Sequence, residues 1–319
     1  MKIAIQGYAG SFHHQAAKTY FGNEIEIVPC SGFRELFKQT ENNEDINGAV
    51  MAIENSIVGS ILPNYSLLQK SNLLVTGEVY LLINQNLLAP RGVRLKDIRE
   101  VYSHPMALLQ CADFLDGHGW KLVETEDTAS TARRIAENKL KHTAAIASSE
   151  AAELYNLNIL QTNVQTEKTN YTRFLVLMKE APRSKKEEAN KASIFFEIDH
   201  HTGSLARILS LIARCGINLS KLQSVAIPQS PWRYAFHTDM EFESLNDFNE
   251  AIDRIKVCTE KLIIYGIYKR GGDNEMTEIT NCIWKLLNPR NKFCRFILAA
   301  IFASVLFSYL SRKAEGMAR

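Results

Sequence analysis

Gly48-Ala-Val-Met-Ala-Ile-Glu-Asn-Ser56 is an apolar run that ends in a carboxylate, an amide and a hydroxyl. A short apolar run of this kind is typical of a buried strand. Two further polar clusters lie at the ends of strand-like runs. Ser103-His-Pro105 follows Arg99–Tyr102, and Asn170-Tyr-Thr-Arg-Phe174 leads into Leu175–Met178. Because open α/β folds bind ligands where strands end, the three clusters together predict one shared site.

Around these clusters, residues 1 to about 180 alternate strand-like and helix-like segments. Strands are predicted at residues 2–6, 24–28, 48–53, 73–83, 99–103, 121–124, 143–147 and 174–178. Helices are predicted at residues 11–21, 32–40, 104–117, 128–138 and 148–155. This alternation predicts an α/β fold with mostly parallel strands.

A second folded unit is predicted after a polar linker at residues 180–191, which contains Pro182 and no apolar periodicity. Strands are predicted at residues 192–198, 218–227, 232–241 and 261–268, with a turn at 228–231. Helices are predicted at residues 203–215 and 245–257. The order βαββαβ indicates a ferredoxin-like unit over residues 192–270.

The remaining tail, residues 271–319, contains an apolar segment at residues 296–310 that has basic residues on both sides. This segment is shorter than the ~20 residues that a helix needs to cross a bilayer. Three interpretations stay open: a buried or oligomer-packing helix, an anchor at a membrane surface, and a poorly ordered extension.

Composition argues against several classes of function. The net charge is +2, without a basic stripe or an acidic tail, which argues against nucleic acid as a partner. The six cysteines are scattered without a C-x-x-C pair, which favours free thiols over disulfides or a metal site. The N-terminus opens directly into the strand at residues 2–6 without the apolar segment of a secretory signal, so we expect a cytoplasmic protein.

The first loop, Gly7-Tyr-Ala-Gly-Ser11, joins a predicted strand to a predicted helix. Glycines let a backbone approach a ligand, and a helix N-terminus favours an anion. The loop lacks the G-x-G-x-x-G spacing, so it does not predict a dinucleotide site. The alternative is an ordinary turn in which Ser11 caps the helix.

The pair Thr172-Arg173 suits acid chemistry on a carboxylate-bearing ligand. Arginine can clamp a carboxylate through two hydrogen bonds and stays charged. An aliphatic hydroxyl is a poor acid unless a neighbouring cation or hydrogen-bond chain supports it, and Arg173 could supply that support. The alternative is a threonine that starts a strand beside a surface arginine. His104 precedes a proline at a strand-to-helix turn, and we interpret it as structural rather than as a base.

Taken together, the motifs resemble those of the prephenate dehydratase family from Met1 to about Lys179. They are Gly7-Tyr-Ala-Gly-Ser-Phe12, Ala52-Ile-Glu-Asn-Ser56, Tyr102-Ser-His-Pro105 with Gln110-Cys111, Asp127-Thr-Ala-Ser-Thr131, Ala144-Ala-Ile-Ala-Ser148 and Asn170-Tyr-Thr-Arg-Phe174. Tyr8-Ala9 and Met106 depart from the residues frequent in the family. The resemblance implies a bilobal catalytic region similar to periplasmic binding proteins, with its site in the cleft. One lobe would hold about 1–78 with 171–179, and the other 79–170.

The resemblance also implies a reaction. The family converts prephenate to phenylpyruvate in phenylalanine biosynthesis, by loss of CO₂ and the ring hydroxyl, and needs no cofactor. Thr172 is then expected to protonate or bind the leaving hydroxyl. Residues implied to assist catalysis are Glu54, Asn55, Ser103 and Gln110, and those implied to bind substrate are Arg173, Ser11, Ser56 and Phe174. Two alternatives stay open: an arogenate dehydratase, and a binding protein that senses an amino acid without catalysis.

Residues 192–270 resemble an ACT domain, the usual regulatory partner of this family. The residues implied to bind an effector are Gly203, Ser204, Leu205, Asn218, Leu219, Gln223 and Ser224. The segment Gln223-Ser-Val-Ala226 departs from the family's Glu-Ser-Arg-Pro. Inhibition by L-phenylalanine and a domain that only assembles subunits therefore both stay open. A homodimer or homotetramer is expected, because ACT sheets commonly pair side by side.

Overall fold

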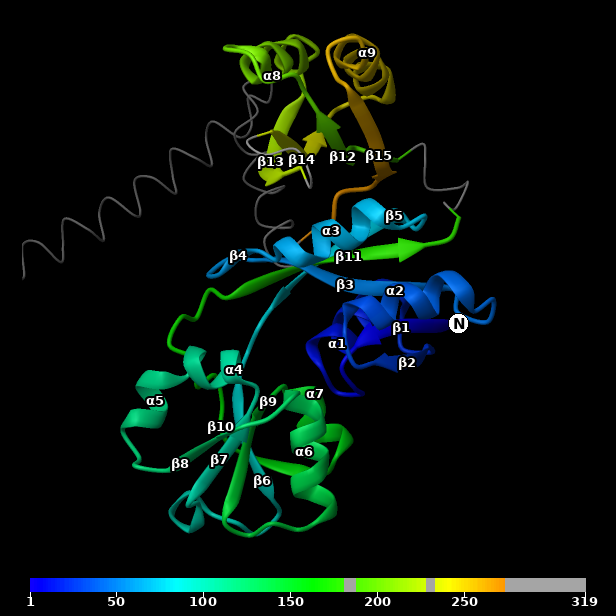
Figure 1. Cartoon of the computed structure of the whole chain (residues 1–319). Coiled ribbons are helices and arrows are strands. Elements are labelled where there is room, and N and C mark those ends of the chain that lie inside the picture. The colour runs from blue at the N-terminus through cyan, green and yellow to red at the C-terminus, as the bar shows by residue number, and fades with distance from the viewer. Residues whose placement is uncertain (181–187, 228–232, 273–319) are drawn as a thin grey trace, which may run out of the picture. The chain divides into compact units, whose positions relative to one another are not determined.

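The computed structural model describes residues 1–180, 188–227 and 233–272. Most of the predicted linker, the turn at 228–231 and the apolar segment at 296–310 lie outside the described residues. The chain divides into two compact units, Met1–Gly271 and Gly272–Arg319. All elements below belong to the first unit, whose three sheets and flanking helices are shown in Figure 1.

The first sheet has the strand order β2-β1-β3-β11-β5, and β4 pairs with β3. Its strands are β1 (Lys2–Gln6), β2 (Glu26–Cys30), β3 (Gly48–Asn55), β4 (Gly59–Ser60), β5 (Leu74–Leu82) and β11 (Tyr171–Met178). Helix α1 (Phe12–Phe21) packs on one face, against Val50 and Val176. Helices α2 (Phe33–Asn42) and α3 (Leu62–Lys70) pack on the other, against Met51 and Leu177. Both faces of β3 and β11 are therefore covered.

The second sheet has the order β10-β6-β9-β7-β8. Its strands are β6 (Asn86–Pro90), β7 (Glu100–Ser103), β8 (Lys121–Glu124), β9 (Thr143–Ala147) and β10 (Leu157–Gln161). Helices α4 (Pro105–Gln110) and α5 (Ala112–Asp116) contribute to one apolar cluster, and α6 (Thr128–Glu137) and α7 (Ser149–Leu154) to another. A short 3₁₀ helix, η1 (Leu95–Asp97), follows β6.

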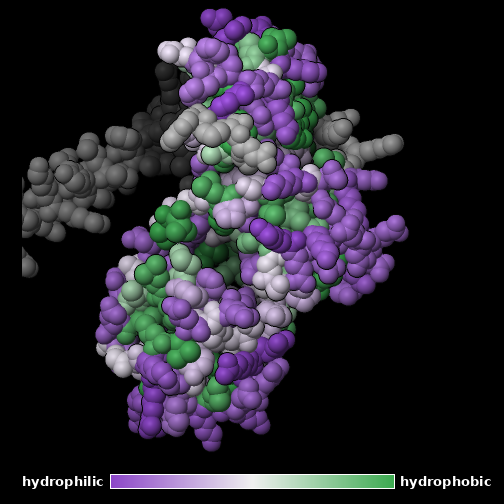
Figure 2. Space-filling view, in the orientation of Figure 1, coloured by the Kyte–Doolittle hydropathy of each residue, from purple (hydrophilic) through white to green (hydrophobic). Residues whose placement is uncertain are grey.

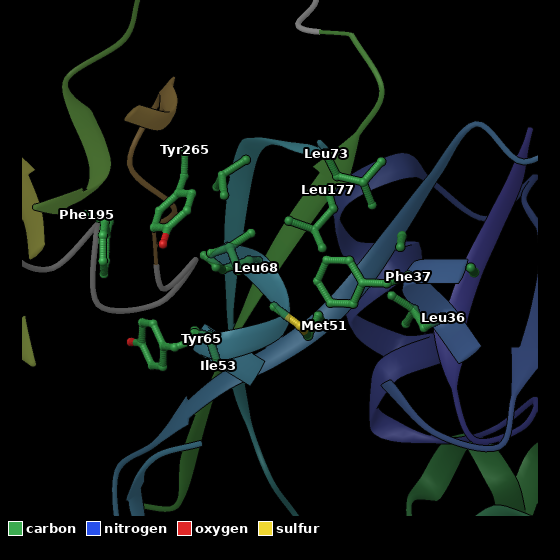
Figure 3. Close-up of a cluster of buried hydrophobic side chains, with 14 of the residues drawn as sticks. Leu36, Phe37, Met51, Ile53, Tyr65, Leu68, Leu73, Leu177, Phe195 and Tyr265 are labelled. Carbon is green, nitrogen blue, oxygen red and sulfur yellow. The ribbon is translucent and has the colours of Figure 1, made fainter. Parts of the chain in front are cut away.

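The third sheet is antiparallel, with the order β13-β14-β12-β15. Its elements are β12 (Lys191–Glu197), α8 (Ser204–Arg214), β13 (Asn218–Ala226), β14 (Tyr234–Glu241), α9 (Leu245–Lys256) and β15 (Lys261–Tyr268). This is the predicted βαββαβ order. Residues of β12 alternate between faces, so that Ile194 packs with the two helices and Phe195 joins the core of the first sheet. Figure 3 shows Phe195 and Tyr265 in one cluster with Tyr65 and Leu68 of α3.

The third sheet touches the first sheet at backbone level. A Cβ atom added to Gly266 of β15 would lie 1.8 Å from the carbonyl oxygen of Val75 in β5. No side chain fits between the two strands at this point. Because the backbones of β15 and β5 are in direct contact, the third sheet cannot move closer to β5 by rearranging side chains.

The predicted α/β class is confirmed, but the prediction of mostly parallel strands is wrong. Strand β1 is parallel to β2 and β3, and β7 is parallel to β8 and β9. The returning strand β11 runs antiparallel to both neighbours, β3 and β5, and β6 is antiparallel to β9 and β10. Five elements escaped the sequence analysis: α3, β4, β6, η1 and β10. Pro63 obscured α3, although proline is well tolerated in the first turn of a helix.

Within the described ranges, no helix is long and apolar enough to cross a membrane. The cysteines there, Cys30, Cys111, Cys215 and Cys258, are free thiols. The same residues hold no group of three or more His, Cys, Asp or Glu side chains that could bind a metal ion.

Acid should weaken the fold through His237 of β14. Its ring is buried and stacks on Tyr265, and burial lowers its pKa to about 4. The unfolded chain binds this proton near pH 6.5, so the stabilisation is fully present above pH 6.5 and is lost as pH falls toward 4. We expect the free energy of unfolding to fall by up to about 1.4 kcal/mol per pH unit from this group in that window. Urea unfolding of wild type and His237→Phe at several pH values checks this, and an equal pH slope in both proteins would contradict it.

Candidate active site

A pocket of about 250 Å³ is lined by residues from the first and second sheets and their helices. The lining residues are Gln6, Ser11, Phe12, His13, Ala52, Asn55, Val58, Ile61, Ile83, Gln85, His104, Met106, Ala107, Gln110, Glu126, Asp127, Thr128, Thr172 and Phe174. Figure 2 shows the molecular surface hollowed between α1 and α4, with hydrophobic residues in the hollow. The polar clusters at the ends of β3 and β7 and at the start of β11 all contribute, as their positions in the sequence predicted.

The central polar contact of the pocket joins Asn55 and Thr172, which are register partners on β3 and β11. Asn55 Nδ2 donates to Thr172 Oγ1 at 3.0 Å and to Asn170 Oδ1 at 2.6 Å. The amide oxygen of Asn55 accepts the N–H groups of Ile57 and Val58, at 3.0 and 3.1 Å, which fixes the orientation of the amide. Because Thr172 Oγ1 accepts from Asn55, its own hydroxyl hydrogen is free to be donated to a bound molecule.

Three more predicted residues line the pocket: Ser11, Gln110 and Phe174. Ser11 also caps α1, because its Oγ accepts the N–H of His14 at 3.3 Å; the cap interpretation is confirmed, and a role in substrate binding stays a prediction. The Phe174 ring is buried and meets the ring of His13 edge-on, with centroids 5.0 Å apart.

Arg173 and Glu54 lie on the opposite side of the first sheet from the pocket. Arg173 Nε donates to Glu78 Oε2 at 2.6 Å, its Nη1 pairs with Asp239, and its Nη2 donates to Tyr268 OH at 3.2 Å. This placement contradicts the predicted role of Arg173 as a clamp for a substrate carboxylate. Consecutive residues of a strand face opposite ways, so Thr172 in the pocket puts Arg173 outside it.

Glu54 is turned away from the pocket by a β-bulge. On β3, Glu54 pairs with Arg173 and Ala52 with Phe174, so Ile53 is an extra residue. Ala52 lines the pocket, and without the bulge Glu54 would face the same way. The bulge instead brings Asn55 into the pocket and leaves Glu54 to pair with Lys221 of β13. The predicted catalytic role of Glu54 therefore does not fit its position.

Ser103 and Ser56 also lie outside the pocket lining. Ser103 is fully buried and donates to the carbonyl oxygen of Ile146 at 2.7 Å. Ser56 is exposed, donates to the carbonyl oxygen of Thr169 at 3.1 Å, and accepts the N–H of Tyr171 at 2.9 Å. Both hydroxyls fix backbone near the pocket, and this explains their contacts better than the predicted catalysis and substrate binding.

His13 was missed by the sequence analysis. Its Nε2 accepts the N–H of Ala52 at 3.3 Å, which leaves Nδ1 as the protonated nitrogen. Burial lowers the pKa of His13 to about 4, so the ring is neutral near pH 7. Its position on the first turn of α1, after the glycine loop, was a possible signal. The sequence does not reveal which face of that turn meets the sheet.

Asp127 and Gln85 were missed as lining residues as well. Asp127 caps α6 by accepting the N–H of Ser130 at 2.7 Å, and burial raises the pKa of its carboxyl group. A Cβ atom on Gly7, which has φ of 87°, would lie 2.8 Å from Asp127 Oδ2, so this loop needs glycine there. Gln85 is buried, and its Oε1 has no hydrogen-bond partner among the described residues.

The glycine loop also joins the two halves of the pocket. Ser148 donates to the carbonyl oxygen of Gly10 at 2.6 Å, and Tyr155 donates to that of Ala9 at 2.7 Å. Both side chains come from the part of the chain that carries the second sheet. The loop therefore fixes the distance between the pocket walls in addition to contributing Ser11.

A family model described as prephenate dehydratase matches residues 3–182 of the chain. Among curated relatives, the arogenate dehydratase/prephenate dehydratase 2 of Arabidopsis thaliana is 38% identical over 278 residues, which cover 84% of this chain and 72% of the relative. The bifunctional chorismate mutase/prephenate dehydratase of Escherichia coli K12 is 30% identical over 273 residues, covering 84% of this chain and 70% of the relative.

Solved structures share the fold over most of the described residues. GqqA, described as a novel type of quorum-quenching acylase, superposes with a TM-score of 0.76 at 27% identity, covering 85% of this chain and 98% of that one. The prephenate dehydratase of Arthrobacter aurescens in complex with L-Phe gives 0.75 at 23% identity, covering 85% and 90%. The similarity to the second structure shows the fold alone.

Proposed function

The chain belongs to the prephenate dehydratase family, and we propose that its pocket converts prephenate to phenylpyruvate. Prephenate dehydratases are hydro-lyases of aromatic amino-acid biosynthesis. The observation that carries the proposal is the hydroxyl of Thr172, held by Asn55 at the pocket with its hydrogen available. An acid at this position is what the loss of a ring hydroxyl requires.

In the proposed step, the bond between the ring and its carboxylate breaks and releases CO₂. The electron pair enters the ring and expels the hydroxyl at the opposite ring carbon, and that oxygen takes the hydrogen of Thr172 to leave as water. Thr172 Oγ1 then regains a proton from solvent, so one proton is consumed for each prephenate converted. The Asn55 N–H donated to Oγ1 stabilises the charge that develops there. This support replaces the one that sequence reasoning assigned to Arg173.

The apolar wall of the pocket helps the carboxylate to leave. Phe12, Phe174 and Ile83 line the pocket beside the polar groups. A carboxylate held against such side chains is poorly solvated, which raises its energy relative to CO₂. Ser11 and Gln110 are neutral hydrogen-bond donors in the same lining, and we propose that they hold the side-chain carboxylate.

Arogenate is the second candidate substrate, because the Arabidopsis relative is named for both arogenate and prephenate. Arogenate carries an ammonium group where prephenate carries a ketone. The Oε1 of Gln85 lies in the pocket lining without a hydrogen-bond partner among the described residues, and it could accept from that ammonium group. We propose prephenate as the preferred substrate, supported by the matching family model and the E. coli relative.

Turnover of both substrates by the purified full chain tests the proposal. We expect phenylpyruvate to form from prephenate without added metal or nucleotide, followed by its absorbance in base. A more than tenfold higher kcat/KM for arogenate would overturn the substrate assignment. Inactivity with both substrates would overturn the enzyme assignment and favour a protein that binds an amino acid without catalysis.

We further propose that residues 192–270 form an ACT regulatory domain that binds L-phenylalanine. The βαββαβ order of the third sheet and its helices supports this. Gly203, Ser204 and Leu205 lie at the start of α8, where Gly203 has φ of 90°. Asn218, Leu219, Gln223 and Ser224 lie along β13, an edge strand of the third sheet. An edge strand can pair with a second copy of itself, which supports a homodimer or homotetramer. Millimolar phenylalanine should lower turnover in the same assay.

A cytoplasmic location stays a prediction for this chain. The Arabidopsis relative is described as chloroplastic. Membrane contact by the tail concerns residues outside the described ranges.

A further inference from the structure

Two neighbouring strands of the first sheet each present one residue to the pocket and the adjacent residue to the third sheet. On β3, Asn55 faces the pocket and Glu54 faces β13; on β11, Thr172 faces the pocket and Arg173 faces β14. The two pocket residues are register partners, and so are the two outer residues. Any movement of the outer pair therefore moves the backbone that carries the pocket pair.

The third sheet carries two charged residues opposite this outer pair. Lys221 on β13 and Asp239 on β14 are register partners. Lys221 Nζ pairs with Glu54 Oε1, and Asp239 Oδ2 pairs with Arg173 Nη1. Two register-paired residues of one sheet thus bind two register-paired residues of the other, through charges of opposite sign.

The two ion pairs differ in burial. The side chain of Arg173 is 5% exposed and that of Asp239 is 8% exposed. Lys191 reinforces that cluster through Glu78 at 3.0 Å, with both side chains essentially inaccessible. In contrast, the side chains of Lys221 and Glu54 are 13% and 30% exposed. Separating a buried ion pair leaves a charge without a counter-charge or water. When a partly exposed ion pair separates, water can solvate both charged groups. The Lys221–Glu54 contact is therefore the adjustable one.

Lys221 also lies close in sequence to residues that are proposed to bind an effector. It lies between Leu219 and Gln223, two of the residues proposed to bind an effector. Lys221 and Gln223 lie on the same face of β13, whereas the register shift between Leu219 and Lys221 turns Leu219 to the opposite face, against the helices of the third sheet. A ligand that shifts β13 would therefore shift the ammonium group that holds Glu54.

We propose that Lys221 is a positioning residue for the dehydratase reaction, holding Glu54 so that Asn55 and Thr172 keep their hydrogen bond, and that an effector bound along β13 acts on the pocket through this contact. The inference rests on the proposed function of the pocket. Lys221 donates to Glu54, and neither residue lines the pocket, so the effect of Lys221 reaches Thr172 through β3 and β11.

The test compares three variants of the full chain. Lys221→Met removes the charge and keeps a long apolar side chain, and Lys221→Arg restores a cation. Lys269→Met is the matched control, because Lys269 also belongs to the third-sheet region and pairs with Glu188, with both side chains about two-thirds exposed. We expect Lys221→Met to lower kcat about tenfold and to change KM little. A tenfold effect is within the usual range of coupling free energies between two sites. We also expect the variant to be inhibited less by phenylalanine. Lys221→Arg should retain most of kcat, and the control should match wild type.

Wild-type kcat in Lys221→Met, or an equal loss of kcat in the Lys269→Met control, would overturn the inference. Loss of kcat that Lys221→Arg does not restore would also count against it. Hydrogen exchange gives a readout independent of turnover. Faster exchange of the backbone amides at residues 52–56 and 171–174 in Lys221→Met than in the control supports the contact's role even if wild type proves inactive. Unchanged exchange at those amides overturns it, whereas inactivity of wild type bears only on the proposed function.

Discussion

Replacing Thr172 by valine is expected to lower kcat for prephenate by about 10²- to 10⁴-fold, the usual contribution of a positioned acid. Valine keeps the branched shape of threonine and removes only the hydroxyl that faces the pocket. Because Asn55 Nδ2 retains Asn170 Oδ1 as an acceptor, the variant should fold and bind substrate with a KM near that of wild type.

The control for this experiment is Thr172→Ser, which keeps a hydroxyl within reach of Asn55. We expect this variant to stay within about tenfold of wild-type kcat, since the acid function survives. Phenylpyruvate formation and thermal unfolding of all three proteins provide the measurements. If the valine variant retains wild-type kcat, Thr172 is not the acid. If both variants lose activity equally, side-chain shape rather than the hydroxyl matters.

Replacing Arg173 by methionine is expected to lower the free energy of unfolding by about 3–5 kcal/mol, the cost of breaking a buried ion pair by removing one partner. Asp239 loses the cation that pairs with it, Glu78 keeps only Lys191, and the side chains of Asp239 and Glu78 are at most 8% exposed. Burial alone would raise the pKa of Asp239, but Arg173 and Lys191 hold it below its usual value. The variant should therefore take up protons more readily than wild type as pH falls.

Arg254→Met is a matched control on the surface. Arg254 pairs with Glu250 one turn away on α9, and the two side chains are 45% and 55% exposed. Its loss should change stability by less than about 0.5 kcal/mol. Urea unfolding of both variants and wild type decides the comparison. If Arg173→Met is as stable as wild type but has a greatly raised KM, Arg173 binds the substrate carboxylate, contrary to its position in the structure.

Several elements were well predicted because their signals are local. The strands at 2–6, 121–124, 143–147 and 261–268 match β1, β8, β9 and β15 in full. Each is a short run bounded by polar or turn residues, and this pattern does not depend on what packs against it. The polar clusters at strand ends likewise predicted that Asn55 and Thr172 would meet, and the family resemblance implied that Gln110 and Ser11 would lie with them.

The direction of individual side chains was not predictable in the same way. Strands β3 and β11 are buried along nearly their whole length on both faces, so hydrophobicity does not distinguish the pocket face from the third-sheet face. The bulge at Ile53 then reverses the alternation between Ala52 and Glu54. Arg173 and Glu54 looked like substrate-binding groups because the sequence places them beside Thr172 and Asn55.

The sequence by itself determined most of the order of elements, the family and the set of polar residues at the strand ends, since these depend on residue type and local spacing. Only the tertiary structure decided which of those residues enter the pocket. That choice depends on the insertion of β11 between β3 and β5, on a one-residue bulge, and on the third sheet covering one face of the first. All three are long-range events, and in a strand with a period of two a shift of one residue exchanges the faces.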